Sequence, residues 1–368
     1  MTSIAARAVR RAPSAAWNER YAGRILSPDG VASHYRPTLG NPHDVLRCLT
    51  LTGFDPGAAV YRYHSALNTA VGGIGAFARY EHSNPHCDLR QWDVDDDRAQ
   101  VETLAKTADV LFCHSDYSAF DALGVRARRD DQLVVRMYHG SVTKGSPMEP
   151  KMIRQREDDA AGAVQLGARL YHKRFSARMH WAPIPMPVAD YLALAATHWT
   201  PLCASRPTFL IGHSPSMRQI KGTTTLEFVV QALRRKGLDV ALLNIEGKPH
   251  GEALAMKARC DVFFDSFWLG MQGSGLEAAA MGQAVVAGDP DARDDYVREL
   301  GFCPYTFADT PETLAVVLER LVVDAGWRTR EALRVHRYTR EYHDYPVVGA
   351  RMWRTFRDHR LGFHGVRS

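Results

Sequence analysis

The sequence lacks long apolar runs, paired cysteines and an apolar leader, and each absence argues against a class of protein. No stretch of about 18 apolar residues occurs among the 368 residues, so no transmembrane helix is predicted. Residues 1–24 contain five arginines and one acid but no apolar core, which argues against a secretory signal. Their Arg, Ser and Ala bias resembles a transit peptide, but we interpret the basic extension, residues 1–40, as a frayed terminus.

The six cysteines are scattered and form no Cys-x-x-Cys pair. This spacing argues against a disulfide scaffold and favours a reducing compartment, so we predict a cytoplasmic protein. Cys48, Cys113 and Cys260 lie in apolar runs and are predicted to be small core residues. The group of His82, His86 and Cys87 lacks a fourth zinc ligand, and we interpret it as part of a polar loop.

Lysine is scarce, with eight lysines against 38 arginines, and positive charge gathers at the two ends. Residues 327–368 hold ten arginines against four acids, a sum of +6, and residues 1–47 hold seven against three, a sum of +4. Since the whole chain carries +5, the middle carries −5. Basic ends of this kind can contact nucleic acid or an anionic membrane surface. The alternative is that the arginine excess reflects coding bias, and both interpretations stay open.

Short apolar runs alternate with helix-period segments, a pattern typical of βαβ units and parallel sheets. In the first half, strands are predicted at 45–51, 108–114 and 133–138, and helices at 58–70, 98–106 and 149–170. In the second half, strands are predicted at 208–212, 239–244, 261–265 and 284–287, and helices at 224–236, 252–258, 276–281, 311–323 and 347–360.

Three prolines, Pro183, Pro185 and Pro187, separate the two halves, and neither a helix nor a central strand tolerates such a run. We therefore predict an α/β chain with two Rossmann-like domains facing each other across a cleft, where ligands bind at the carboxyl ends of the strands. The predicted segments are the basic extension (1–40), an N-terminal domain (41–182), a linker (183–200), a C-terminal domain (201–345) and a basic C-terminal helix (346–368) that can cross back to the N-terminal domain.

A glycine-rich loop carries the strongest functional signal. After the strand predicted at 261–265, Gly270, Gly273 and Gly275 precede a helix with Glu277 in its first turn. Glycines let backbone N–H groups approach an anion, and a helix N-terminus adds partial positive charge, so a pyrophosphate fits here. Glu277 could accept hydrogen bonds from ribose hydroxyls. The alternative is a tight strand-to-helix turn in which Glu277 only favours the helix dipole.

Two stretches of the second half resemble the donor-binding signature of the retaining family 4 glycosyltransferases. Residues 261–286 carry Asp-Val, then Gly, then Glu-Ala-Ala-Ala-Met-Gly and Val-Val in the family's order. Residues 212–223 place Arg218 and Lys221 where the family has two cations that hold the donor diphosphate. An arginine fork and a lysine point charge beside a loop suit two phosphates, whereas either cation alone could be a solvated surface residue.

The resemblance implies the GT-B fold and transfer of a sugar from a nucleotide sugar to an unidentified acceptor hydroxyl with retention of configuration. It also implies that no metal or other cofactor is required. In the first half, residues 56–68 resemble the acceptor-side helix, and residues 134–141 resemble the strand whose closing histidine, His139, lies near the transferred sugar. His139 could otherwise be a turn residue after a buried strand.

The implied catalytic residues are His139, Arg218, Lys221 and Glu277. The implied donor-binding residues are Gly212, His213, Ser214, Gly270, Gln272, Gly273, Ser274 and Gly275.

Two positions depart from the family pattern. Leu269 stands where the family has the first of two glutamates, which contacts the donor sugar, and Gln272 or Asp265 could substitute for it. Ala284 stands where the family has a proline. Leu269 therefore leaves one alternative function open, a catalytically degenerate GT-B protein that binds a nucleotide sugar or glycan. The arginine-rich ends leave a second, a DNA-modifying glycosyltransferase. The Asp-x-Asp spacing at residues 93–97, which binds Mn²⁺ or Mg²⁺ in another glycosyltransferase class, precedes a predicted helix, and we interpret it as helix capping.

Overall fold

The computed structural model describes residues 47–52, 59–71, 75–79, 92–93, 103, 105–114, 132–139, 162–174, 176, 178–198 and 208–365. These residues fall into two compact units. The N-terminal domain comprises the described residues up to 185 together with those from 343 onward, and the C-terminal domain comprises 186–342. Among the described residues, no helix is both long and apolar enough to cross a membrane.

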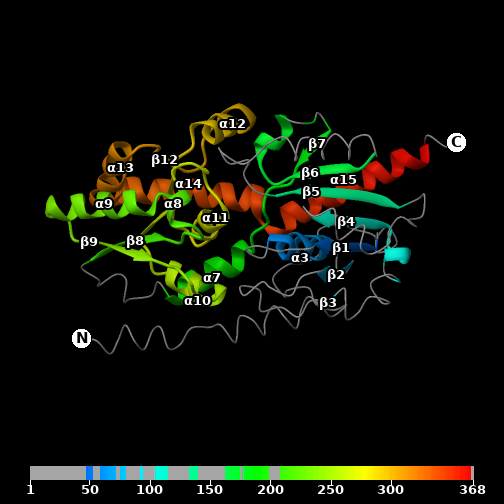
Figure 1. Ribbon diagram of the computed structural model, residues 1–368, viewed down its shortest axis with the longest axis horizontal. Helices are drawn as coiled ribbons and strands as arrows, with labels where there is room; N and C mark the ends of the chain where they lie inside the picture. Colours follow the sequence, from blue (N-terminus) through cyan, green and yellow to red (C-terminus); the bar gives the residue numbers. More distant parts are fainter. Residues whose placement is uncertain are drawn as a thin grey trace. The chain divides into compact units, whose positions relative to one another are not determined.

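The N-terminal domain is built on a parallel sheet whose described strands follow the order β3-β2-β1-β4-β5-β6-β7 (Figure 1). The strands are β1 (Cys48–Thr52), β2 (Gly75–Arg79), β3 (Trp92–Asp93), β4 (Val110–His114), β5 (Leu133–Tyr138), β6 (Val164–Gly167) and β7 (Met179–Trp181). Strands β1, β4, β5 and β6 are buried along their whole length, which fits their mostly apolar sequences.

Two helices from opposite ends of the chain pack on each other and on this sheet. Helix α3 (Ala59–Val71) and helix α15 (Tyr345–Gly365) lie side by side (Figure 1). The buried Met352, Trp353 and Phe356 of α15 belong to the same apolar core as Tyr63 and Phe112. This packing confirms the prediction that the C-terminal helix crosses back to the N-terminal domain.

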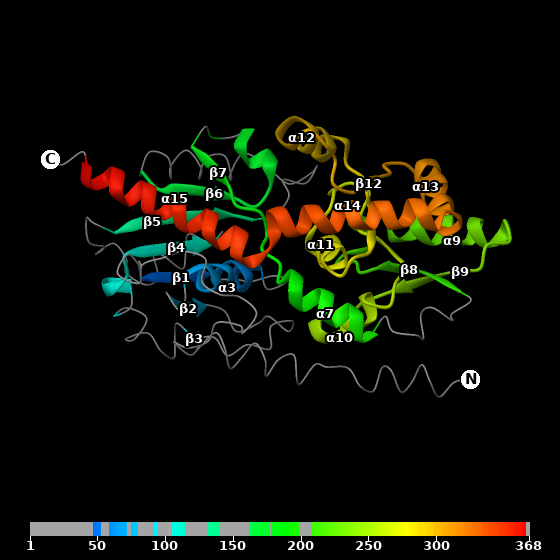
Figure 2. The ribbon, with the colours of Figure 1, turned by 180° about the vertical axis from the view of Figure 1, so that it is seen from behind.

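The C-terminal domain holds a second parallel sheet, with the strand order β12-β11-β10-β8-β9. Its strands are β8 (Phe209–His213), β9 (Val240–Asn244), β10 (Val262–Phe264), β11 (Ala284–Ala287) and β12 (Thr306–Phe307). Its helices are α7 (Val188–His198), α8 (Arg218–Lys221), α9 (Thr223–Arg235), α10 (His250–Lys257), α11 (Gly273–Ala280), α12 (Pro290–Leu300), α13 (Pro311–Val323) and α14 (Ala325–His343), whose last residue falls to the other unit. Helices α9 and α13 contact each other over one core (Figure 2).

Most elements predicted for the second half are present within a few residues of their predicted bounds, but three predictions need correction. The helix predicted at 149–170 is wrong in its last part, because Val164–Gly167 forms the buried strand β6. The predicted linker at 183–200 contains helix α7, whose Val188, Tyr191 and Leu194 are buried. Helices α12 and α14 were not predicted, and both are rich in charged residues.

Candidate functional site

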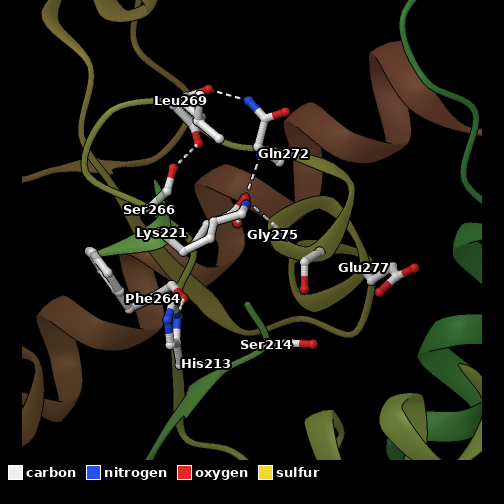
Figure 3. A network of polar contacts seen from close by, with 12 residues as sticks. His213, Ser214, Lys221, Phe264, Ser266, Leu269, Gln272, Gly275 and Glu277 are labelled. Carbon is white, nitrogen blue, oxygen red and sulfur yellow. Dashed lines mark hydrogen bonds and ion pairs between the residues drawn. The ribbon is translucent and has the colours of Figure 1, made fainter. Parts of the chain in front are cut away.

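The carboxyl edge of the C-terminal sheet gathers the predicted donor-binding residues. Strand β8 ends at His213, strand β10 ends at Phe264, and the loop after β10 leads into α11 at Gly273. Parallel strands end at one edge of a sheet, which is where ligands bind in this class of domain. Figure 3 shows Lys221, Gln272 and Gly275 converging at this edge.

Lys221 forms a buried ion pair with Asp265. Its Nζ lies 2.7 Å from Asp265 Oδ1, and the two side chains are 8% and 1% exposed. The other carboxylate oxygen, Oδ2, accepts hydrogen bonds from the backbone N–H groups of Gln272 and Gly275, the latter at 3.2 Å. The cation predicted for the diphosphate is thus held in place by an internal carboxylate that the helix N-terminus also binds.

Arg218 is the first residue of α8, the short helix that ends at Lys221, and its side chain lies at the surface. Its side chain is 45% exposed and donates to Glu227 Oε1 at 2.5 Å and to Glu246 Oε1 at 2.7 Å. The hydrogen bond that Arg218 donates to Glu227, together with the charges of both acids, raises the pKa of the guanidinium above its usual range. Because exposed ion pairs are weak, the guanidinium can exchange these carboxylates for a phosphate at little cost.

Glu277 accepts hydrogen bonds through both of its carboxylate oxygens. Oε1 lies 2.9 Å from His250 Nε2, and Oε2 lies 2.5 Å from Lys257 Nζ. Lys257 is itself buried and also donates to Ser274 Oγ at 2.8 Å, so it ties Glu277 to the start of α11. The sequence analysis missed His250 and Lys257. A signal for Lys257 was present, because this lysine ends an otherwise apolar stretch of α10.

Two of the predicted glycines are required by close approaches inside the domain. A Cβ added at Gly212 would lie 2.5 Å from Cys260 Sγ, so only glycine lets α10 and its following turn pack on β8. A Cβ added at Gly275 would lie 2.6 Å from Asp265 Oδ2. Gly275 therefore lets its own N–H reach the carboxylate. Gly270 lies in the loop, where its carbonyl accepts from Ser266 Oγ at 3.1 Å.

The remaining predicted donor-binding side chains are engaged within the domain. His213 is fully buried, with Nδ1 2.9 Å from the carbonyl oxygen of Phe264 and Nε2 2.9 Å from Thr223 Oγ1. Burial lowers the pKa of His213 to about 4, so its ring is neutral at pH 7. Ser214 Oγ donates to the carbonyl of Ile245 at 3.2 Å, and Gln272 Nε2 donates to the carbonyl of Leu269. Their roles toward a ligand stay predictions.

In the N-terminal domain, His139 follows β5 and pairs with a second histidine, His114. His139 Nε2 lies 2.6 Å from His114 Nδ1, and the two rings are stacked with centroids 4.9 Å apart. Burial, followed by the charge of Arg169, lowers the pKa of His139 to about 4. The pair is therefore neutral at pH 7, with one ring nitrogen donating and the other accepting. His114, at the end of β4, was not identified from the sequence.

The two motifs weighed as metal sites in the sequence, and interpreted there as helix capping and a polar loop, fall largely outside the described residues. Within the described ranges, no group of three or more His, Cys, Asp or Glu side chains could hold a metal ion. The backbone of Asp93 belongs to β3. Asp95, His82, His86 and Cys87 lie outside the described residues.

No protein-family model matches the sequence, and no curated protein sequence matches it either. Solved structures do match. The Anabaena protein HepE in complex with UDP and glucose has a TM-score of 0.60 at 12% identity, covering 84% of this chain and 99% of its own. Sucrose-phosphate synthase from Thermosynechococcus elongatus has a TM-score of 0.58 at 13% identity, covering 84% and 98%.

A third match is an α-glucosyltransferase in complex with UDP and a 13-mer DNA, with a TM-score of 0.58 at 10% identity, covering 84% of this chain and 98% of its own. At such low identity these likenesses concern the fold. Together with the two parallel sheets, they show that the chain has the fold of GT-B glycosyltransferases, with two Rossmann-like domains.

Proposed function

We propose that the protein is a glycosyltransferase that moves a sugar from a nucleotide sugar to an acceptor hydroxyl, with retention of configuration, as in family 4. The observation that carries this proposal is that one short helix, α8, holds both Arg218 and Lys221, and that Lys221 is joined through Asp265 to the start of α11 at the carboxyl edge of the C-terminal sheet (Figure 3). Support comes from the Anabaena protein HepE, which has a similar fold and whose structures hold UDP or UDP-glucose.

In this mechanism the bond between the anomeric carbon and the diphosphate breaks, the acceptor oxygen takes the diphosphate's place, and the proton of the acceptor hydroxyl passes to an oxygen of the leaving diphosphate. Arg218 stabilises the charge that develops on the leaving diphosphate, and the amides at the start of α11 do so as far as Asp265 leaves them free. Lys221 contributes as far as Asp265 leaves it free. His139, a neutral imidazole, is proposed to contact the transferred sugar. No metal ion or other cofactor is part of the proposal.

The test is thermal stabilisation by a panel of nucleotide sugars, because a ligand of the native state raises the unfolding midpoint. One donor should shift the midpoint of the wild type and should not shift that of Arg218→Ala. The matched control is Arg337→Ala, which removes another exposed, ion-paired arginine, here with Glu341 on α14. Equal shifts in wild type and Arg218→Ala would refute the assignment of Arg218, and no shift with any donor would count against the proposed function.

A second candidate is a GT-B protein that binds a nucleotide sugar or glycan without transferring it. The observations that favour it are Leu269 in the place of the family glutamate, and the full engagement of Glu277 by His250 and Lys257. Release of UDP or another nucleoside diphosphate from the donor, by transfer or slow hydrolysis, would exclude this candidate.

For the arginine-rich ends, we propose DNA or an anionic membrane surface as partners, since clustered arginines attract phosphate groups. In the described part of the C-terminal arginine-rich segment, Arg334 pairs with Glu331 and Arg337 with Glu341. A DNA complex would have to weaken steeply with salt. An interaction that salt leaves unchanged would argue against DNA as the acceptor.

A further inference from the structure

Asp265 is the central anion of the candidate donor site. It follows strand β10, and its side chain is 1% exposed. One carboxylate oxygen accepts from Lys221 Nζ at 2.7 Å, and the other accepts from the N–H groups of Gln272 and Gly275. The carboxylate therefore satisfies a lysine ammonium and two amides at the start of a helix at the same time.

These three donors are the kind that a diphosphate needs. A lysine ammonium forms strong charge-assisted hydrogen bonds, and the N-terminal amides of a helix bind anions through their N–H groups and the helix dipole. In this protein a carboxylate of the chain itself fills that position. Glycine at position 275 permits the hydrogen bond from its own N–H to Asp265 Oδ2, because a Cβ at this position would lie 2.6 Å from that oxygen.

A phosphate brought to this position would meet a fixed negative charge in a largely buried environment. Two negative charges held by the same hydrogen-bond donors repel each other, and burial reduces the screening of this repulsion by water. We propose that Asp265 is an internal anion that competes with the diphosphate for Lys221 and the α11 amides, and thereby weakens the binding of nucleoside diphosphates. This inference rests on the proposed function, since it concerns the same site.

The opposite role would be positioning, with Asp265 holding Lys221 in the orientation that a diphosphate needs. The two roles differ in the sign of one effect. If Asp265 competes, removing its charge tightens diphosphate binding. If Asp265 positions Lys221, removing its charge weakens binding, because the lysine loses its fixed orientation.

The experiment measures the dissociation constants of UDP and of inorganic pyrophosphate by calorimetry. Pyrophosphate is included because it does not depend on which base the site prefers. Asp265→Asn should bind both probes at least about tenfold more tightly than the wild type. The matched control is Asp261→Asn, which removes the same charge from the other end of β10, where Asp261 accepts from the N–H of Leu210 at 2.7 Å. The dissociation constants of Asp261→Asn should lie within about twofold of the wild-type values, because Asp261 lies at the amino end of β10, at the opposite edge of the sheet.

A second comparison keeps the test valid if the unpaired Lys221 prevents Asp265→Asn from folding. Lys221→Met together with Asp265→Asn replaces the buried pair by neutral side chains of similar size, a change that is often tolerated. The double variant should bind pyrophosphate at least about tenfold more tightly than Lys221→Met alone, because the competing carboxylate is gone. Equal binding by these two variants would overturn the inference.

The outcomes separate the inference from the proposed function. Binding by the wild type, with no gain in Asp265→Asn or in the double variant, overturns the inference and leaves the proposed function standing. Binding by Asp265→Asn but not by the wild type supports both and explains a weak native site. No binding of any probe by any folded variant overturns both.

Discussion

At the scale of single residues, buried charges of the C-terminal domain occur in complementary groups. Lys221 is balanced by Asp265, and Lys257 is balanced by Glu277. A buried ion pair adds little net stability, but removal of one partner leaves an uncompensated charge. Substitution of a single member therefore changes stability as well as chemistry. This is why Arg218→Ala, at an exposed position, is a cleaner probe of donor binding than Lys221→Ala.

Lys257→Met should lower the free energy of unfolding by about 3–5 kcal/mol, because Glu277 keeps its burial and loses its cation. The measurement is urea denaturation. The control is Lys236→Met, which breaks an exposed pair with Glu319 and should cost less than about 1 kcal/mol. If Lys257→Met lowered the free energy of unfolding no more than Lys236→Met does, the burial of the Glu277 carboxylate would not depend on Lys257.

The buried His213 predicts a dependence of stability on pH. Its pKa in the folded protein is about 4, below the ordinary 6.5, so the folded state resists a proton that the unfolded state accepts. The contribution of His213 is fully present above pH 6.5 and is lost as the pH falls from 6.5 to about 4. His213→Gln can keep one donor and one acceptor and does not titrate.

Between pH 6.5 and 4, unfolding free energies of His213→Gln should therefore fall less steeply than those of the wild type, by up to about 1.4 kcal/mol per pH unit. Parallel curves for the two proteins would show that His213 titrates normally in the folded state.

At the scale of elements, α15 completes the core of the N-terminal domain. Phe356 is fully buried, and its ring contacts Phe112 of β4 with centroids 5.6 Å apart. The helix therefore belongs by packing to a domain whose last strand, β7, ends at Trp181, 164 residues before α15 begins at Tyr345. Arginines of α15 lie next to its buried apolar residues, Met352, Trp353 and Phe356, in the sequence, as in an ordinary amphipathic helix.

Phe356→Ala should lower the free energy of unfolding by about 3–5 kcal/mol, from lost apolar burial and the cavity left behind. Leu333→Ala on α14 is the control, because Leu333 is 63% exposed and its truncation should cost less than about 0.5 kcal/mol. Chemical denaturation followed by circular dichroism measures both. A small effect of Phe356→Ala would mean that α15 does not stabilise the N-terminal domain.

At the scale of the whole molecule, the residues proposed for the nucleotide all belong to the C-terminal domain, whereas Phe356 belongs to the N-terminal domain. Phe356→Ala should therefore lower the unfolding temperature and leave the UDP dissociation constant of the folded protein within about twofold of the wild type. Calorimetric titration well below the transition tests this expectation. A loss of affinity in proportion to the loss of stability would show that the nucleotide site depends on the N-terminal core.

The sequence by itself determined the alternation of strands and helices, the two Rossmann-like halves and the glycine-rich strand-to-helix loop. These features depend on local periodicity, on glycine and proline, and on short apolar runs, all of which a linear pattern carries. The same reasoning failed at β6, where a four-residue buried strand lies within a predicted helix, since short apolar stretches have no distinguishing period.

Which charges meet follows from the three-dimensional fold and not from the linear sequence. Lys221 and Asp265 are 44 residues apart, Lys257 and Glu277 are 20 apart, and His114 and His139 are 25 apart. Each contact arises where two different elements of one domain come together, so no spacing in the sequence predicts it. The sequence therefore indicated a site for an anion at the start of α11, and the folding of β10 beside α8 decided that Asp265 is the anion already bound there.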